Sequence, residues 1–147
     1  MSRSSWVICH LPLIEGRHDG RRILLPVAVL ASRDPFDLTH FVYQGLLDTG
    51  ATSSWITPKV ISDLSLRELG KETVSVATEE RTASVYLFRI GLFGEKSVET
   101  SIPFVFPDIT GFQLSQHQGF DVLIGMDVIR QCHLIVSRSG DWSLAFG

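Results

Sequence analysis

The stretch Gly45-Leu46-Leu47-Asp48-Thr49-Gly50-Ala51-Thr52-Ser53-Ser54 takes an apolar segment of the chain directly into an acidic residue. A carboxylate between aliphatic residues and a glycine costs free energy unless it is hydrogen-bonded or has a chemical task. The simpler interpretation is a strand that runs into a polar turn, because Asp, Thr, Gly and Ser are common turn residues. Asp48 is therefore the first residue that a functional hypothesis has to explain.

A second informative stretch lies downstream, at Phe120-Asp121-Val122-Leu123-Ile124-Gly125-Met126-Asp127-Val128-Ile129. Its apolar residues predict a buried strand that reaches Gly125 and continues into a short helix. Asp127 falls at the start of that helix, where the helix dipole favours a carboxylate.

Together, a strand ending in Asp-Thr-Gly-Ala and a later aliphatic strand reaching a glycine and a helix resemble the retropepsin-like aspartic protease family. The resemblance runs roughly from Val7 to Phe146. It implies an all-β, retropepsin-like acid protease barrel with one short C-terminal helix and a flap hairpin. Many viral members carry a bracing ion pair where this chain has Thr52 and Met126, so the chain is more similar to cellular and bacterial members.

Composition is that of a folded protein. The chain has 147 residues, of which 44% are hydrophobic and 20% charged, and residues 1–147 are expected to form a single domain. Its net charge of −3 provides no basic surplus for nucleic acid or for an anionic membrane surface. We therefore expect neither of these partners.

Cysteine usage and hydropathy indicate a reducing compartment. Cys9 and Cys132 are far apart in sequence, without Cys-x-x-Cys spacing, and the five histidines show no metal-ligand spacing. The longest apolar run, 23–31, is too short for a bilayer span and contains Pro26. No secretory signal is recognisable at the N-terminus, so a cytoplasmic location is expected.

Most of the remaining pattern is typical of strands and turns. Ser32–His40 is expected to be a loop, and Pro58–Leu69 has near-helical spacing that ends at Gly70. Strands are predicted at Trp6–Leu11, Ile23–Leu30, Phe41–Leu47, Tyr86–Leu92, Val98–Phe106, His133–Ser137 and Trp142–Phe146.

A half-exposed hairpin is predicted in the middle of the chain. Glu72–Ala77 and Thr82–Phe88 alternate polar and apolar residues on either side of the charged segment Thr78–Arg81. The family resemblance implies that this hairpin is the flap that closes over a bound peptide. Its tip lacks the glycines that usually give a flap mobility, and Glu79 and Glu80 are expected to disfavour acidic substrates.

The resemblance assigns Asp48 as the catalytic residue, supported by Thr49 and Gly50. The mechanism needs two carboxylates and the chain has one Asp-Thr-Gly, so a second copy of the chain is expected to supply the other in a homodimer. The apolar ends of the chain, including Trp142–Phe146, would suit a sheet shared between two copies. The alternative for that end is a strand in the chain's own core.

The implied substrate is a protein or peptide with apolar side chains around the cleaved bond. No metal or organic cofactor is expected. Two functions remain open, an aspartic endopeptidase and a non-catalytic peptide-binding or dimerisation module. The residues expected to contact the peptide are Ala51, Thr52, Val76, Ala77, Thr78 and Ile124, with Ile56 in the lining.

Overall fold

The computed structural model of the chain describes residues 11–94, 102–115 and 118–147. Two short helices and eleven strands are described there. They are β1 (Leu13–Arg17), β2 (Leu24–Ala31), β3 (Phe41–Leu47), β4 (Trp55–Ile56), α2 (Pro58–Asp63), β5 (Glu68–Val76), β6 (Glu79–Leu92), β7 (Phe104–Val105), β8 (Ile109–Gln113), β9 (Val122–Ile124), α3 (Met126–Ile129), β10 (His133–Val136) and β11 (Asp141–Ala145).

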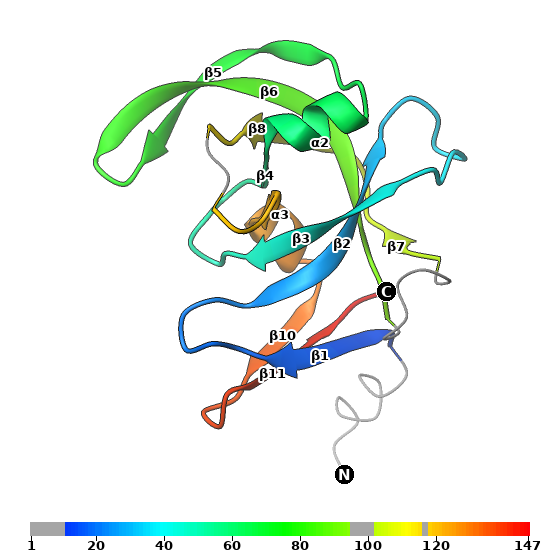
Figure 1. The fold of residues 1–147 in the computed structure, drawn as a ribbon, viewed down its shortest axis with the longest axis vertical. Coiled ribbons are helices and arrows are strands. Elements are labelled where there is room, and N and C mark those ends of the chain that lie inside the picture. The colour runs from blue at the N-terminus through cyan, green and yellow to red at the C-terminus, as the bar shows by residue number, and fades with distance from the viewer. Residues whose placement is uncertain (1–10, 95–101, 116–117) are drawn as a thin grey trace.

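Two sheets organise the molecule. The larger runs in the order β2-β3-β9-β4-β8-β6-β5, and an additional pairing of β2 with β6 closes its middle part into a barrel. The smaller sheet has the order β1-β11-β10 and lies across one end of the barrel (Figure 1). Aliphatic and aromatic side chains from both sheets and both helices fill the main core between them, and Ala28, Leu30 and Phe93 form a second, smaller cluster.

Several predicted strands are confirmed. The strand expected at Phe41–Leu47 is β3, and those expected at Ile23–Leu30, His133–Ser137 and Trp142–Phe146 correspond to β2, β10 and β11. Most of Trp6–Leu11 and the first part of Val98–Phe106 lie outside the described residues. Three strands were not predicted, β1, β4 and β8, because they are short or too polar to show a clear alternation.

The helix predicted at Pro58–Leu69 exists but ends early, at Asp63. Pro58 occupies its first turn, where a missing N–H costs nothing. Ser65 has a φ of 49°, a left-handed conformation that cannot continue the helix, and the Leu66 N–H turns back to the Ile61 carbonyl. The next strand, β5, begins at Glu68 instead of after Gly70.

The predicted flap hairpin is formed by β5 and β6, and Figure 1 shows it arching out from the barrel. The expected four-residue tip, Thr78–Arg81, is wrong. Pairing continues to Val76 opposite Glu79, which leaves a two-residue turn of Ala77 and Thr78. Ala77 carries the turn with a φ of 55°, a left-handed conformation that glycine adopts more easily.

The C-terminal strand is part of the chain's own core. β11 pairs with β1 on one side and with β10 on the other, and Trp142, Leu144 and Phe146 are buried. Both edges of β11 are paired within the chain, which leaves neither edge free for a strand of a second copy. Of the two interpretations left open by the sequence, the structure has the strand of the chain's own core.

The loop predicted at Ser32–His40 is held by a buried cation. Arg89 on β6 is 5% exposed, and its guanidinium donates to the carbonyl oxygens of Ala31, Pro35, Asp34 and Asp37. Burial of an unpaired charge is costly, so these contacts fix the loop against the barrel.

No helix among the described residues is long and apolar enough to cross a membrane. The expected single-domain organisation stays a prediction.

Candidate functional site

Asp48 directly follows β3, and the pairing of strands brings the second sequence motif beside it. β3 runs parallel to β9, with Leu47 opposite Ile124, and the Asp48 N–H donates to the Ile124 carbonyl at 2.9 Å. The loop then turns tightly, because the Ala51 N–H donates to the Asp48 carbonyl at 3.2 Å. The Gly50 N–H donates to the Asp48 carboxylate at 2.9 Å and orients it, half-buried, at the surface.

A buried hydrogen-bond network fixes this loop to α3. Ser54 is fully buried, and it donates to the two carboxylate oxygens of Asp127, from its hydroxyl at 2.7 Å and its N–H at 2.8 Å. The Gly125 N–H donates to the Ser54 hydroxyl at 3.1 Å. Hydrogen bonds to a charged acceptor are stronger than neutral ones, so the network holds the acidic loop in one position.

Main-chain contacts reinforce the same connection. The N–H groups of Met126 and Asp127 donate to the carbonyl oxygens of Ala51 and Thr52 at 2.8 and 3.1 Å. Gly125 allows this close approach, because a Cβ there would lie 2.5 Å from the Ser53 carbonyl oxygen. The acidic loop is thus braced against α3 through main-chain atoms of Thr52 and Met126.

The role of Ser54 and Asp127 was missed in the sequence. Asp127 was explained by the helix dipole alone, and it does accept from the Val128 N–H within α3. One signal was available: a serine that directly precedes the apolar pair Trp55-Ile56 needs a hydrogen-bond partner if it is buried.

A cleft of about 780 Å³ lies between the Asp48 loop and the flap hairpin. Of the residues predicted for the site, it brings together Asp48, Gly50, Ala51, Thr52, Val76 and Ala77. Thr49 and Thr78 are exposed next to these, in the acidic loop and at the flap turn. The roles predicted for all of these residues in catalysis and in peptide binding stay predictions.

The apolar floor of the cleft is a cross-strand row that was not predicted. Phe112 on β8, Trp55 on β4 and Leu123 on β9 are direct register partners, and all three line the cleft. Trp55 and Phe112 also pack ring to ring, with centroids 5.1 Å apart. Ile56 and Ile124, expected in the lining, are instead fully buried in the core, because neighbouring residues on a strand face opposite sides.

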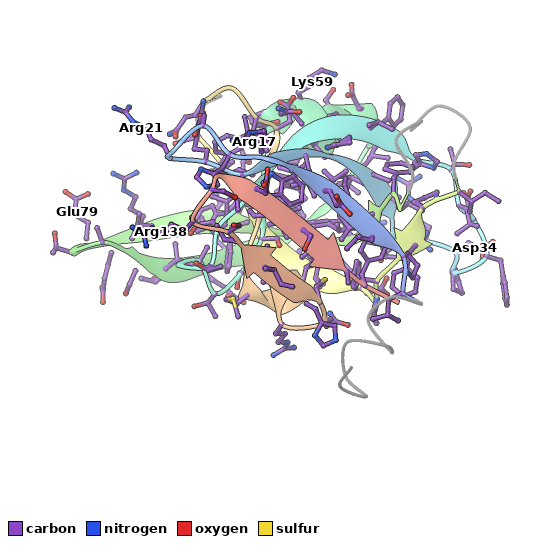
Figure 2. The ribbon with its side chains drawn as sticks, turned by 90° about the horizontal axis from the view of Figure 1, so that it is seen from below. Arg17, Arg21, Asp34, Lys59, Glu79 and Arg138 are labelled. Carbon is purple, nitrogen blue, oxygen red and sulfur yellow. The ribbon has the colours of Figure 1, made fainter. Side chains whose placement is uncertain are left out.

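The cleft carries little charge. Among the lining residues that the structure describes, Asp48 and Arg81 are the charged ones. Arg81 lies on the flap hairpin and forms an ion pair with Glu79, with N and O atoms 3.2 Å apart. Figure 2 shows Glu79 at the far end of this hairpin, across the molecule from Asp34.

A polar cluster supports β3 from outside. The Tyr43 hydroxyl donates to the Asp63 carboxylate at 2.8 Å, and Lys59 of α2 donates to the same carboxylate at 2.6 Å. The hydrogen bond from Lys59, followed by that from Tyr43, holds the pKa of Asp63 below its usual value. Burial, and then the bond to Asp63, raises the pKa of the Tyr43 hydroxyl. The cluster ties α2 to the strand that carries Asp48.

Cys132 has the properties of a structural thiol. Burial raises its pKa to about 11, and its Sγ lies 3.6 Å from the Val128 carbonyl oxygen. A thiol nucleophile reacts as the thiolate, which is scarce at neutral pH with such a pKa. In the described part of the chain, no three His, Cys, Asp or Glu side chains are grouped as they would be around a metal ion.

The sequence matches the profile of a known protein family. A family profile described as aspartyl protease matches residues 40–128, more than half of the chain. The matched region runs from the start of β3 through the flap to α3, and it therefore contains both sequence motifs. No curated protein sequence is significantly similar to the chain.

Solved structures show a similar fold. A retropepsin-like aspartic protease from Rickettsia conorii superposes with a TM-score of 0.57 at 14% identity, over 91% of this chain and 92% of that protein. EIAV protease, in a complex with an inhibitor, superposes with a TM-score of 0.50 at 14% identity, over 78% of this chain and 91% of that protein. The all-β, retropepsin-like fold expected from the sequence is confirmed.

Proposed function

The chain belongs to the aspartyl protease family and has a retropepsin-like fold, and from this premise we propose that it is an aspartic endopeptidase acting through Asp48 of two subunits. The observation that carries the proposal is the position of Asp48. Its half-buried carboxylate lies on a tightly braced loop at the floor of a large cleft, beneath a hairpin.

The proposed chemistry follows from two carboxylates held close together. Two such groups about 3 Å apart cannot both ionise cheaply, so the pair shares one proton. The ionised Asp48 then takes a proton from a bound water, which attacks the peptide carbonyl carbon. The protonated Asp48 donates to the carbonyl oxygen and stabilises the tetrahedral intermediate. Thr49 and Gly50 would support the two loops at the axis between the subunits.

We place the contact between subunits at the edge of β10. No described strand pairs with the outer edge of β10, and its Ile135 and Val136 side chains are 56% and 53% exposed. An exposed apolar edge strand is a template for pairing with another chain. Two copies related by a twofold axis could pair these edges into one continuous sheet, leaving β11 in its own core.

The proposed substrate is an extended segment of a protein or peptide. A strand-like peptide between the floor and the flap would gain main-chain hydrogen bonds in the manner of an added strand. Ala51, Thr52, Val76 and Ala77 lie along the cleft, in position to contact it. Trp55 and its row partners offer an apolar surface for a side chain near the cleaved bond.

The second candidate is a peptide-binding or dimerisation module without catalytic activity. The flap favours it, because the turn contains no glycine and Ala77 holds a left-handed conformation that costs free energy. A hairpin held in that way can bind peptides without opening rapidly enough for turnover.

For either candidate function, we propose a cytoplasmic location, as expected from the cysteines.

A peptide library tests the proposal. Purified wild-type protein, Asp48→Ala and the surface control Asp141→Asn are incubated with it from about pH 4 to about pH 7, and the dimer fraction is recorded in parallel. We expect cuts with the wild type and the control, and none with Asp48→Ala. Absence of cuts from a confirmed wild-type dimer would favour the binding module instead.

A further inference from the structure

The charge pattern of the cleft carries an inference about its substrate. Uncharged residues, both apolar and polar, make up most of the cleft lining, and Asp48 is one of its two charged residues in the described chain. The other charged lining residue in the described chain is Arg81, which contributes a cation from the flap. An arginine at the edge of a cleft is suited to a carboxylate, because its planar guanidinium can form two parallel hydrogen bonds.

The strand register places Arg81 on the flap side of the cleft, four residues along β6 from Val85, which is the register partner of Phe112 in the apolar row. Arg81 on β6 is the direct partner of Val74 on β5, and both residues line the cleft. Partners across an antiparallel pair present their side chains on the same face. The row of Phe112, Trp55 and Leu123 lines the same cleft from the barrel side. An apolar surface and one cation are therefore available to the same bound peptide.

In the unbound chain, Arg81 has a replaceable partner. Its ion pair with Glu79 joins side chains that are 60% and 68% exposed, within the hairpin itself. Exposed ion pairs of this kind contribute only about 0–1 kcal/mol. Because the pair is this weak, a carboxylate carried by a peptide in the cleft can displace Glu79 at small cost.

We propose that Arg81 is a specificity-determining residue that selects peptides carrying an aspartate or glutamate near an aromatic or aliphatic side chain. The apolar side chain rests on the row of Trp55, Phe112 and Leu123, and the acidic one binds the guanidinium. The proposal rests on the proposed function only in that a peptide occupies the cleft. It reverses the expectation, drawn from Glu79 and Glu80, that acidic substrates are disfavoured.

Binding to the Asp48→Asn protein tests the proposal separately from catalysis. The probes are labelled short peptides with one phenylalanine, flanked on either side by glutamates in one set and by glutamines in the other. We expect the glutamate peptides to bind about tenfold more tightly, a difference of about 1.4 kcal/mol. Adding Arg81→Gln should remove this preference, and adding Arg81→Glu should transfer it to lysine-flanked peptides.

Lys71→Gln in the same background is the matched control. Lys71 lies on β5 of the same hairpin but outside the cleft lining, so the substitution removes the same charge without changing the cleft. The preference should survive it. Equal binding of the two peptide sets, binding of neither, or a preference that persists in Arg81→Gln would overturn the proposal. Selective binding without cleavage by the wild type would overturn the endopeptidase function and leave the role of Arg81 intact.

Discussion

The floor and the roof of the cleft are built in opposite ways. On the floor, the Asp48 loop is joined to α3 by buried side-chain and main-chain hydrogen bonds, with Ser54 and Gly125 out of contact with solvent. On the roof, the tip of the flap hairpin is exposed, and the pairing of β5 with β6 is its main support. From these contacts we expect the floor to be the rigid part of the site and the flap tip the part of low local stability.

The difference separates two requirements of a peptide-cleaving site. A general base must be held within hydrogen-bonding distance of its water, and small displacements reduce the rate strongly. A flap must admit an extended peptide and release its products, which requires a segment of low local stability. Substitutions in the floor should therefore affect folding and activity together, and substitutions in the flap tip should affect activity or binding alone.

Gly125→Ala should have the largest effect on stability. The new Cβ would lie 2.5 Å from the Ser53 carbonyl oxygen and 2.9 Å from the Ala51 carbonyl oxygen, and both are main-chain atoms of the acidic loop. We expect a loss of about 3 kcal/mol in the free energy of unfolding, measured by urea denaturation. A variant as stable as the wild type would show that the floor is not rigid.

Asp127→Asn should cost about 2 kcal/mol, because the two donors of Ser54 lose their charged acceptor in a buried site. Peptide cleavage should fall as well, since the loop carrying Asp48 is released. Asp141→Asn is the control, because Asp141 is exposed and forms a surface ion pair with Arg17. Equal stability of the two variants would contradict the bracing role of Asp127.

Ala77→Gly should change stability by less than about 1 kcal/mol, in the stabilising direction, because glycine adopts the left-handed turn without strain. The melting temperature should rise slightly or stay the same. The substitution should change the rate at which peptides associate, measured by stopped-flow fluorescence. A large change in global stability would show that the flap tip is coupled to the core.

Asp63→Asn should have the smallest effect, and one that depends on pH. Because Lys59 and Tyr43 lower the pKa of Asp63 below 3.8, its contribution is complete above that pH and is lost as the pH falls through the lowered value. Melting temperatures of wild type and variant should therefore differ near neutrality and converge as the pH falls below 3.8 and through the lowered pKa of Asp63. A constant difference across this range would exclude an electrostatic contribution.

The sequence predicted the parts of the fold that have a long or strongly apolar pattern. β3, β9 and α3 were found because aliphatic runs end there at Asp48 and Gly125. The two-residue strand β4 was missed, because two residues show no period. It is nevertheless essential to the site, since it carries Trp55 into the middle of the apolar floor.

The predicted lining of the cleft was displaced by one residue on two strands. Ile56 and Ile124 were expected where Trp55 and Leu123 are found. Both faces of these short strands are apolar, one toward the core and one toward the cleft, so the sequence does not reveal which residues face which side.

The link between Ser54 and Asp127 was missed for another reason. Their separation of 73 residues is bridged only by the tertiary structure.

Mixing two forms of the protein tests most directly whether one site is built from two Asp48 residues. Wild type and Asp48→Asn are combined in varying proportions at constant total concentration, exchanged to equilibrium, and assayed for peptide cleavage. Because only wild-type pairs carry two aspartates, activity should fall with the square of the wild-type fraction, to about a quarter in an equal mixture. Activity proportional to the wild-type fraction would contradict the shared site and show that each chain acts alone.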